Sequence, residues 1–387
     1  MSGGRELGAE GAQLLAPARS ELAFDHRGVG DGEQLDLGGL TLGVMTTPGH
    51  TPEHVAYLLS DGDQPLALFS GGTLMAGGVA RTDLVSPELT EQLARDAYAS
   101  IHQKLLTLPD ELAVFPTHGA GSFCSVAPTG ERTTTIGRER ATNPHLQADN
   151  VDEFVRSVLG GLGSFPSYFL RLRDVNQSGP TLYGRGGPDL EALSPEVVEA
   201  MSGEDVVLID LRSVERFAAG HIPGSIAIEL RAEFGTWLGW VVDPAARLVF
   251  VAGLGQNLAE AVRQSLNVGY ENLVGYLDGG VDAWSEERPL ADLAVVPASA
   301  ADPDLAVIDV RQQDEWAAGH VPGAQHVELG SISAHAFEAT PDFLVHCAHG
   351  QRAMTAASLM RRSGVASVAV TRAGAQELVA ARASRAR

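Results

Sequence analysis

An internal repeat constrains the second half of this chain more than any other feature. The segment IDLRSVERFAAGHIPG begins at Ile209, and IDVRQQDEWAAGHVPG begins at Ile308, 99 residues later. That spacing matches one small domain. A repeat of this size predicts two copies of one fold in succession. The full length of 387 residues leaves room for a further domain before them.

Each copy has a short apolar run downstream of the repeated motif. The runs are LVFV at residues 248–251 and FLV at 343–345, and both suit buried strands. Residues 354–362 (MTAASLMRR) then have the composition of a helix, without Gly or Pro. Strands that alternate with helices predict an α/β fold with parallel sheets. Within the motif, we expect Asp-x-Arg to end one strand and Gly-His-x-Pro-Gly to form the turn into the next. We therefore expect these residues to have a structural role and not to take part in catalysis.

Cys347 stands between the second apolar run and its helix, in the segment HCAHGQRA at residues 346–353. A sulfur atom in a strand–loop–helix lies near unpaired backbone N–H groups and the positive end of the helix dipole. Both stabilise a negative charge on sulfur. Arg352 adds a cation that can bind an anion. The alternative for a lone cysteine is a buried structural residue.

The strand, the Cys-x-x-Gly-x-Arg loop and the helix resemble the active-site loop of the rhodanese family of sulfurtransferases. The resemblance implies that Cys347 is the catalytic nucleophile, which carries a persulfide, and that Arg352 binds the anionic donor. The loop residues implied in substrate binding are Ala348, His349, Gly350, Gln351 and Ala353. Cys-based phosphatases are the competing family, but they place the Arg six positions after the Cys. Ala353 occupies that position here, which favours sulfur transfer.

The first copy lacks this chemistry. Alignment of the loops pairs three positions of the first copy with the second: Gly255 with Gly350, Ala252 with Cys347, and Asn257 with Arg352. Without a thiol or a cation this copy cannot carry a persulfide, so we predict a structural or docking module. We expect the end of the second copy, through Arg387, to be frayed.

The first 180 residues have their own strand and helix patterns. We expect strands at residues 40–45 and 65–70, and amphipathic helices at 87–108 and 150–162. Three segments resemble loops of the metallo-β-lactamase fold: TPGHTPEH at 47–54, SGGTL at 70–74 and FPTHG at 115–119. Two more, GAGS at 119–122 and TIGRER at 135–140, resemble the persulfide dioxygenase branch of that fold.

That branch uses a mononuclear Fe(II), and the resemblance implies ligands from a His-x-His-x-Asp motif, the TPGHT histidine and the Asp of Gly-Asp-Thr-Leu. Of these only His50 is present, because Gly72 replaces the carboxylate and no His-x-His motif precedes it. His118 would be an accessory metal residue. We predict a vestigial site at His50 and His118 with no working iron, in which both histidines, like His54, are hydrogen-bonded loop residues. The segment MSGGREL at 1–7 resembles the helix that follows the missing motif, which implies a misplaced start or a truncation.

The predicted architecture is therefore α/β with an α+β first domain. We place an N-terminally incomplete metallo-β-lactamase-like αββα domain at residues 1–182 and a Gly/Pro-rich linker at 183–190. A rhodanese-like domain without catalytic Cys follows at 191–292, and a rhodanese domain with Cys347 at 293–387.

Composition limits the partners. A formal charge of −22 disfavours nucleic acid and anionic membranes. No apolar run approaches the roughly 18 residues of a transmembrane helix. With Cys124 and Cys347 as the only cysteines, we do not expect a disulfide framework, and a reducing cytoplasm fits. We read Cys124 as a small buried hydrophobe.

The order of domains resembles bacterial persulfide dioxygenase–sulfurtransferase fusions of sulfide detoxification. We therefore predict a thiosulfate or persulfide sulfurtransferase that needs no cofactor. Its expected partners are thiosulfate, glutathione persulfide or other low-molecular-weight persulfides as donors, and thiols as acceptors. A homo-oligomer is compatible with the sequence. The alternatives are a functional persulfide dioxygenase and a non-catalytic binding or scaffold protein.

Overall fold

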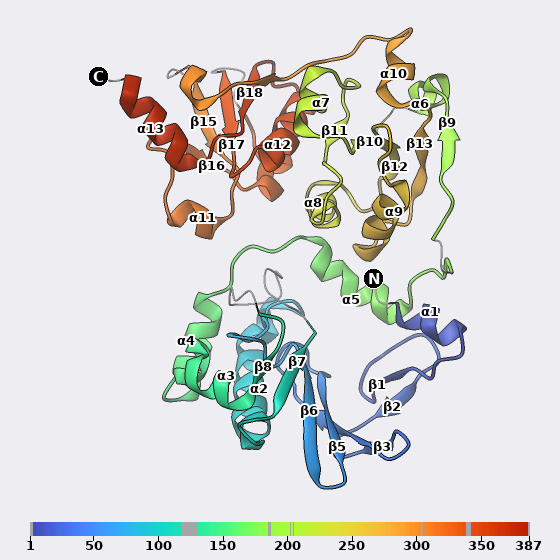
Figure 1. Cartoon of the computed structure of the whole chain (residues 1–387), viewed down its shortest axis with the longest axis vertical. Coiled ribbons are helices and arrows are strands. Elements are labelled where there is room, and N and C mark those ends of the chain that lie inside the picture. Colours follow the sequence, from blue (N-terminus) through green and yellow to red (C-terminus); the bar gives the residue numbers. More distant parts are fainter. Residues whose placement is uncertain are drawn as a thin grey trace. The chain divides into compact units, whose positions relative to one another are not determined.

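The computed structural model describes residues 3–117, 131–184, 187–201, 203, 205–302, 305–337 and 342–385. The chain divides into two compact units, which are considered separately. The N-terminal unit holds residues 2–165 and 169–181, and the C-terminal unit holds residues 166–168 and 182–387. Figure 1 labels their elements.

The N-terminal unit is built on a six-stranded sheet in the order β3-β4-β5-β6-β7-β8, antiparallel except between β6 and β7. Its strands are β3 (Gln34–Asp36), β4 (Thr41–Thr46), β5 (Val55–Asp61), β6 (Gln64–Gly71), β7 (Ala113–Pro116) and β8 (Thr134–Thr135). A parallel pair, β1 (Leu15–Pro17) and β2 (Arg27–Val29), lies beside it. The helices are α1 (Gly4–Ala9), α2 (Thr90–Gln103), α3 (Ile136–Thr142), α4 (Val151–Gly160) and α5 (Tyr168–Ser178).

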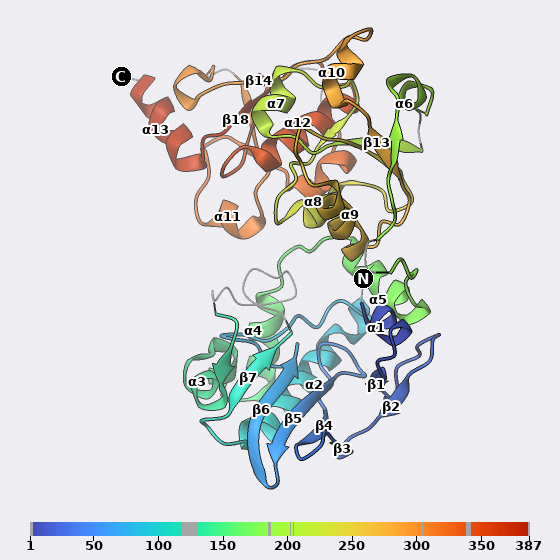
Figure 2. The same cartoon turned by 45° about the vertical axis from the view of Figure 1, so that its right-hand side comes forward.

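Helices α2 and α4 pack on one face of this sheet (Figures 1 and 2). Alternation decides which side chains face them: Leu68 and Val114 are fully buried in the core, whereas Phe69 and Phe115 point to the other face and are exposed. Ile101 and Phe154 complete the core from the helices. The expected strands and helices of this unit are confirmed within a few residues at each end.

The C-terminal unit contains two five-stranded parallel sheets of the same topology. The first has the order β11-β10-β12-β13-β9, with strands β9 (Glu191–Leu193), β10 (Val206–Asp210), β11 (Ile226–Ala227), β12 (Arg247–Val251) and β13 (Leu273–Leu277). The second, β16-β15-β17-β18-β14, has strands β14 (Ala294–Val295), β15 (Ala306–Asp309), β16 (Gln325–His326), β17 (Phe343–His346) and β18 (Val368–Thr371). The predicted α/β fold with parallel sheets is confirmed.

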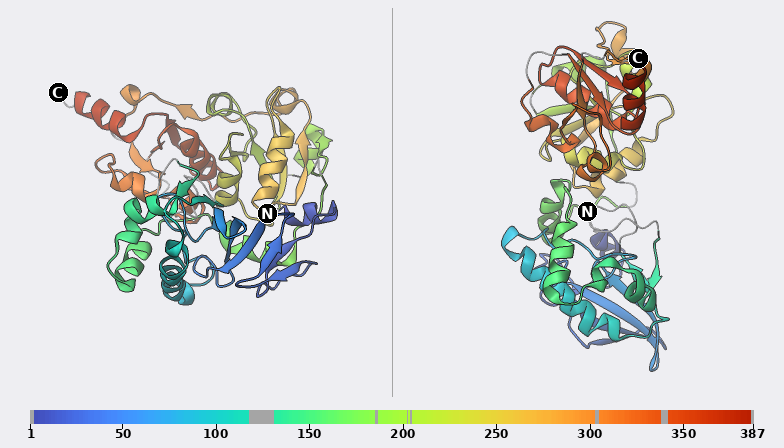
Figure 3. Two further views of the ribbon diagram at one scale, coloured as in Figure 1. Left: turned by 60° about the horizontal axis from the view of Figure 1, so that its bottom comes forward. Right: turned by 90° about the vertical axis from the view of Figure 1, so that its left-hand side faces the viewer.

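Helices cover these sheets (Figure 3), and their central strands are apolar because both faces are buried. The first copy has helices α6 (Pro195–Met201), α7 (Val214–Ala219), α8 (Phe234–Val241), α9 (Leu258–Asn267) and α10 (Gly280–Ser285). The second has α11 (Gln313–Ala317), α12 (Gln351–Arg362) and α13 (Ala375–Arg385), with a 3-10 segment, η5 (Leu329–Ala334). Helix α12 begins three residues before the expected helix and lies between the two sheets, where it contacts β11, β17 and β18.

The expectation of a frayed chain end is wrong for the described residues. Helix α13 continues to Arg385, and Ala375 and Leu378 are buried in the core of the second copy. Apolar side chains at helical spacing hold this segment against η4 (Ala298–Ala300). Within the described ranges, no helix is long and apolar enough to span a bilayer.

Candidate functional site

Cys347 lies where the second sheet meets its longest helix. Strand β17 is buried along its whole length, and Cys347 directly follows it with 1% of its surface exposed. The backbone N–H of Gly350 donates a hydrogen bond to Cys347 Sγ over 3.1 Å. Since helix α12 begins at Gln351, the sulfur faces the helix N-terminus, where backbone N–H groups stabilise negative charge.

Gly350 is required at the turn that directs an N–H group at the sulfur. Its φ is +96°, in the left-handed region that favours glycine. A Cβ atom there would also come within 2.7 Å of Arg372 Cγ. The other predicted loop residues differ in exposure: Ala353 is buried, Ala348 and Gln351 are half-buried, and His349 is exposed.

Arg352 is held by a carboxylate that the sequence pattern did not single out. Its Nη1 lies 2.5 Å from Glu315 Oε2 and its Nη2 lies 2.8 Å from Glu315 Oε1. Burial acts to lower the pKa of Arg352, but Glu315 and the negative charge available on Cys347 raise it above its ordinary value. Burial acts to raise the pKa of Glu315, but the hydrogen bonds and charge of Arg352 hold it below its usual range. Both groups are therefore charged at neutral pH.

An aromatic side chain of the first copy packs beside Arg352. The guanidinium carbon of Arg352 lies 5.6 Å from the ring centre of Trp237 on α8, within range of a cation–π interaction. Trp237 stacks on Trp240 with ring centres 5.3 Å apart. Gly330 of η5 allows this close packing, because a Cβ atom there would lie 1.9 Å from Trp240 Nε1.

Beneath the loop lies a buried polar cluster. Arg311 donates to both oxygens of Asp309 and to the carbonyl of Gly319. His346, fully buried, has Nε2 3.3 Å from Asp309 Oδ2, without the alignment of a hydrogen bond. Burial acts to raise the pKa of Asp309, but His346 and Arg311 hold it well below its usual range. This cluster fixes the strand end from which Cys347 projects.

The corresponding loop of the first copy is closed by its own side chain. Gln256 Oε1 accepts a hydrogen bond from the N–H of Gly253 over 2.7 Å, and Gln256 Nε2 donates to the carbonyl of Leu211 over 2.7 Å. Asn257 caps helix α9, which begins only at Leu258. The backbone N–H that could hold an anion is therefore already occupied.

Two buried hydrogen bonds tie α12 to the first copy. Thr355 Oγ1 donates to the carbonyl of Ala227 over 2.6 Å, and the N–H of Ala227 donates to Ser358 Oγ over 3.1 Å. Arg372, packed against Gly350, pairs with Glu215 of α7. The helix whose N-terminus faces Cys347 is thus positioned from both sheets.

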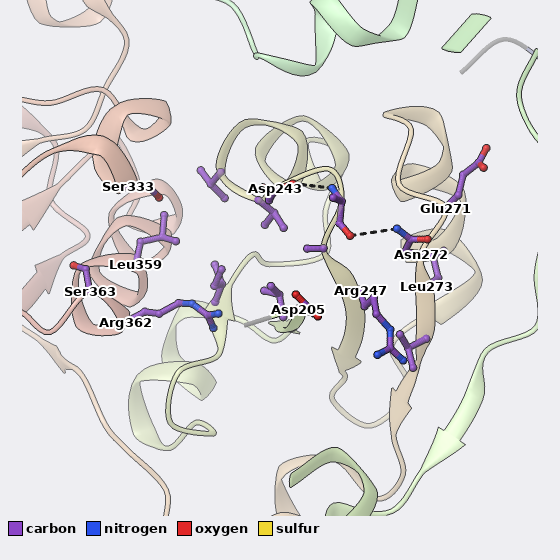
Figure 4. A pocket seen from close by; sticks show the side chains of 17 residues that line it. Asp205, Asp243, Arg247, Glu271, Asn272, Leu273, Ser333, Leu359, Arg362 and Ser363 are labelled. Atoms are coloured by element: carbon purple, nitrogen blue, oxygen red, sulfur yellow. Dashed lines mark hydrogen bonds between the residues drawn. The ribbon is translucent and has the colours of Figure 1, made fainter. Parts of the chain in front are cut away.

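A groove of about 1010 Å³ opens at the other end of α12 (Figure 4). It is lined by Leu359 and Arg362 of α12 and by residues at the starts of β10, β12 and β13, among them Asp205 and Arg247. No residue of the Cys347 loop lines it. A helix of this length spans about 18 Å, so the groove is remote from the sulfur.

In the N-terminal unit, His54 is a structural residue. Its Nδ1 lies 2.9 Å from the hydroxyls of Thr47 and Thr73, and its Nε2 accepts from the N–H of Gly72 over 3.1 Å. Burial, followed by the charge of His50, lowers the pKa of His54 to about 4. A neutral ring with both nitrogens engaged cannot also bind a metal.

The described residues do not fit an iron ion. His50 Nδ1 lies 2.8 Å from the carbonyl of Arg81, and a Cβ atom at Gly72 would come within 2.9 Å of the His50 ring. A carboxylate has no room at position 72 while that ring stays in place. Among the described residues, no three His, Cys, Asp or Glu side chains lie close enough to hold a metal. His118 and Cys124 lie outside the described residues.

The TIGRER segment has a structural role in the N-terminal unit. Glu139 is 1% exposed, and both of its carboxylate oxygens accept from the N–H of Gly77 over 3.0 Å. Thr134 and Asn143 donate to the same carboxylate over 2.7 and 2.8 Å. A carboxylate with four hydrogen bonds stabilises the loop that follows Gly72.

Sequence reasoning missed Glu315 and Trp237. Both residues lie on helices, and the residue that each contacts, Arg352, is far away in the sequence. The repeat contained one signal for Glu315: the first copy has Arg216 in its place and Asn257 in place of Arg352. The carboxylate and the cation thus occur together in one copy and are both absent from the other.

The sequence profile of the rhodanese-like domain matches residues 194–287 and 294–381. A solved metallo-β-lactamase from Staphylococcus aureus subsp. aureus COL superposes with a TM-score of 0.63 and 26% identity. The superposition covers 71% of this chain and 80% of that one. This chain is a fusion of a metallo-β-lactamase-like domain with two rhodanese-like domains.

Curated relatives match parts of the fusion. The mitochondrial persulfide dioxygenase of Homo sapiens is 31% identical over 148 residues, which are 38% of this chain and 49% of that protein. A probable metallo-hydrolase of Bacillus subtilis is 42% identical over 95 residues, 24% of this chain and 41% of that protein. The fusion therefore spans about half the length of these relatives.

Proposed function

We propose that this fusion is a sulfurtransferase of sulfide and persulfide metabolism, and that Cys347 carries the sulfur. The hydrogen bond from the Gly350 N–H to Cys347 Sγ, at the N-terminus of α12, is the observation that carries the proposal. The rhodanese-like profile over both copies and the likeness to a persulfide dioxygenase support a role in sulfur metabolism.

In the first half-reaction, the Cys347 thiolate attacks the outer sulfur of a donor persulfide, RS–SH. A new S–S bond forms to Cys347, the donor S–S bond breaks, and the thiolate RS⁻ leaves with the electron pair. With thiosulfate, sulfite is the leaving group. Backbone N–H groups at the start of α12 stabilise the charge on the enzyme persulfide.

In the second half-reaction, an acceptor thiolate attacks the outer sulfur of the Cys347 persulfide. The product is the acceptor persulfide, and the electron pair returns to Cys347 as thiolate. Cyanide can take the same sulfur as thiocyanate. The proposed donors are thiosulfate, glutathione persulfide and other small persulfides, and no cofactor takes part.

Cys347→Ser tests this function directly. We expect turnover of thiosulfate or persulfide to fall by at least about 10³-fold, because the nucleophile is lost. The matched control is Ala252→Ser, at the equivalent position of the first copy, which should leave turnover unchanged. Equal turnover in wild type and Cys347→Ser would refute the proposal, and absence of any turnover in wild type would favour a binding or scaffold protein.

A second candidate is persulfide dioxygenation by the N-terminal unit, which the 31% identity to a persulfide dioxygenase favours. The described residues around His50 and Gly72 do not fit the metal, so no reaction step is assigned to them. Metal analysis and persulfide-dependent oxygen uptake on the same preparation test this candidate. About one iron per chain together with oxygen uptake would establish it.

A further inference from the structure

The arginines around the Cys347 loop are all matched by carboxylates. Arg352 pairs with Glu315, Arg311 with Asp309, and Arg372 with Glu215. Among the described residues near the loop, no guanidinium is left free to bind a dianion.

Glu315 is fixed in position and does not swing freely. Its carboxylate binds Arg352 through two parallel hydrogen bonds, a geometry that is both strong and directional. It also accepts from the N–H of Gln312 over 3.2 Å, which closes a capping box at the start of α11. The carboxylate therefore stays on Arg352 unless an incoming anion displaces it.

Two classes of sulfur donor meet this pair differently. Thiosulfate carries a sulfonate group directly bonded to the sulfur that is transferred. A sulfonate bound by Arg352 would meet the Glu315 carboxylate, which already binds the same guanidinium at 2.5 and 2.8 Å. An organic persulfide has a carbon atom bonded there, and any charged groups it carries lie farther from the transferred sulfur. Like charges in a partly buried site repel strongly, and an unfavourable contact with one ligand is a general means of selecting another.

We propose that Glu315 is a specificity-determining residue that makes the Cys347 site select organic persulfides over thiosulfate. The inference rests on the proposed sulfurtransferase function and names its donor class. Arg352 still stabilises the single negative charge of the leaving thiolate, whereas the Glu315 carboxylate repels a dianion at the same place.

The test measures sulfur loading of Cys347 in a single turnover of the full chain, by mass spectrometry. The donors are thiosulfate and the persulfide of 2-mercaptoethanol, whose body is uncharged. We expect wild type to load from the persulfide at least about tenfold faster than from thiosulfate at equal concentration. A wild-type preference for thiosulfate would overturn the inference without any variant.

The variant is Glu315→Gln, which keeps the shape of the side chain and removes its charge. We expect loading from thiosulfate to rise about tenfold and loading from the persulfide to change less than about twofold. Asp314→Asn, an exposed neighbour on the same helix, is the matched control and should leave both rates unchanged. Circular dichroism melting checks that each variant is folded.

The outcomes separate this inference from the function on which it rests. Loading that depends on Cys347 but has the same donor ratio in wild type and Glu315→Gln overturns the donor selection alone. No loading of wild type from either donor overturns both. A raised thiosulfate rate in Glu315→Gln, with the persulfide rate maintained, supports the selection.

Discussion

The two rhodanese-like copies share a framework and differ in the loop that would hold a sulfur. In both, the strand-end Asp binds the Arg two residues later through Nε at 2.9 Å and Nη2 at 2.6 Å. That Arg also reaches a carbonyl eight residues further, Gly220 or Gly319. Because the copy without a cysteine keeps this geometry, the Asp-x-Arg motif builds the fold and not the chemistry.

The loops differ in where the following helix begins. Both turn through a left-handed glycine, Gly255 or Gly350. In the first copy Asn257 caps the helix and Gln256 occupies a loop N–H, whereas α12 begins directly after Gly350 and leaves N–H groups facing Cys347. An anion site in this fold therefore needs an uncapped helix as well as a nucleophile.

Among the variants that test this difference between the copies, Arg352→Gln should have the largest effect on sulfur transfer. Removal of the cation leaves the Glu315 carboxylate without its partner and removes the anion-binding group, so we expect kcat/KM for sulfur transfer to fall by about 10²–10³-fold. Arg361→Gln, at the far end of the same helix, is the control. Asn257→Arg in the first copy should change turnover less than about twofold. Full activity in Arg352→Gln would show that the backbone alone binds the donor.

The paired variants Asp309→Asn and Asp210→Asn test the shared framework. Each leaves a nearly buried guanidinium without its carboxylate, and we expect each to lower the free energy of unfolding by about 3 kcal/mol or more. Urea unfolding of the full chain at pH 7 measures both. A loss confined to Asp309→Asn would mean that the two copies depend on the motif differently.

The stability difference between wild type and Asp309→Asn depends on pH with a definite sign. The pKa of Asp309 is held below its ordinary value of 3.8, so its ionised form stabilises the fold at neutral pH. That contribution is lost as the pH falls below about 4 toward the folded-state pKa. The difference between wild type and Asp309→Asn should shrink in that range, and a difference that grows there would contradict the assignment.

Thr355→Val should have a smaller effect, at the contact between the copies. It removes a buried hydrogen bond to the carbonyl of Ala227 and keeps the side-chain shape, so we expect a loss of about 1–2 kcal/mol of stability. Arg372→Ala breaks an ion pair whose partners are both more than half exposed, and should cost at most about 0.5 kcal/mol. Equal losses in urea unfolding would show that the buried bond does not position α12.

The sequence predicted much of this architecture because its signals are local. The repeat at Ile209 and Ile308, the apolar strand before Cys347 and the uninterrupted helix after it are all patterns within a few residues. The same holds for the left-handed turn, since Gly350 has the same place in the loop as Gly255. The expectation for the chain end was wrong, because Ala375 and Leu378 of α13 have helical spacing and pack into the core of the second copy.

Tertiary structure alone decided what surrounds the sulfur. Glu315 and Arg352 are 37 residues apart in sequence, and Trp237 comes from the other copy, so their contact depends on how α11, α8 and α12 pack. The same is true of His50, whose ring fills the space beside Gly72. Local sequence patterns determine the strands, the turns and the place of the nucleophile. The charged groups around a bound donor depend instead on contacts between residues far apart in the sequence, which no local pattern reveals.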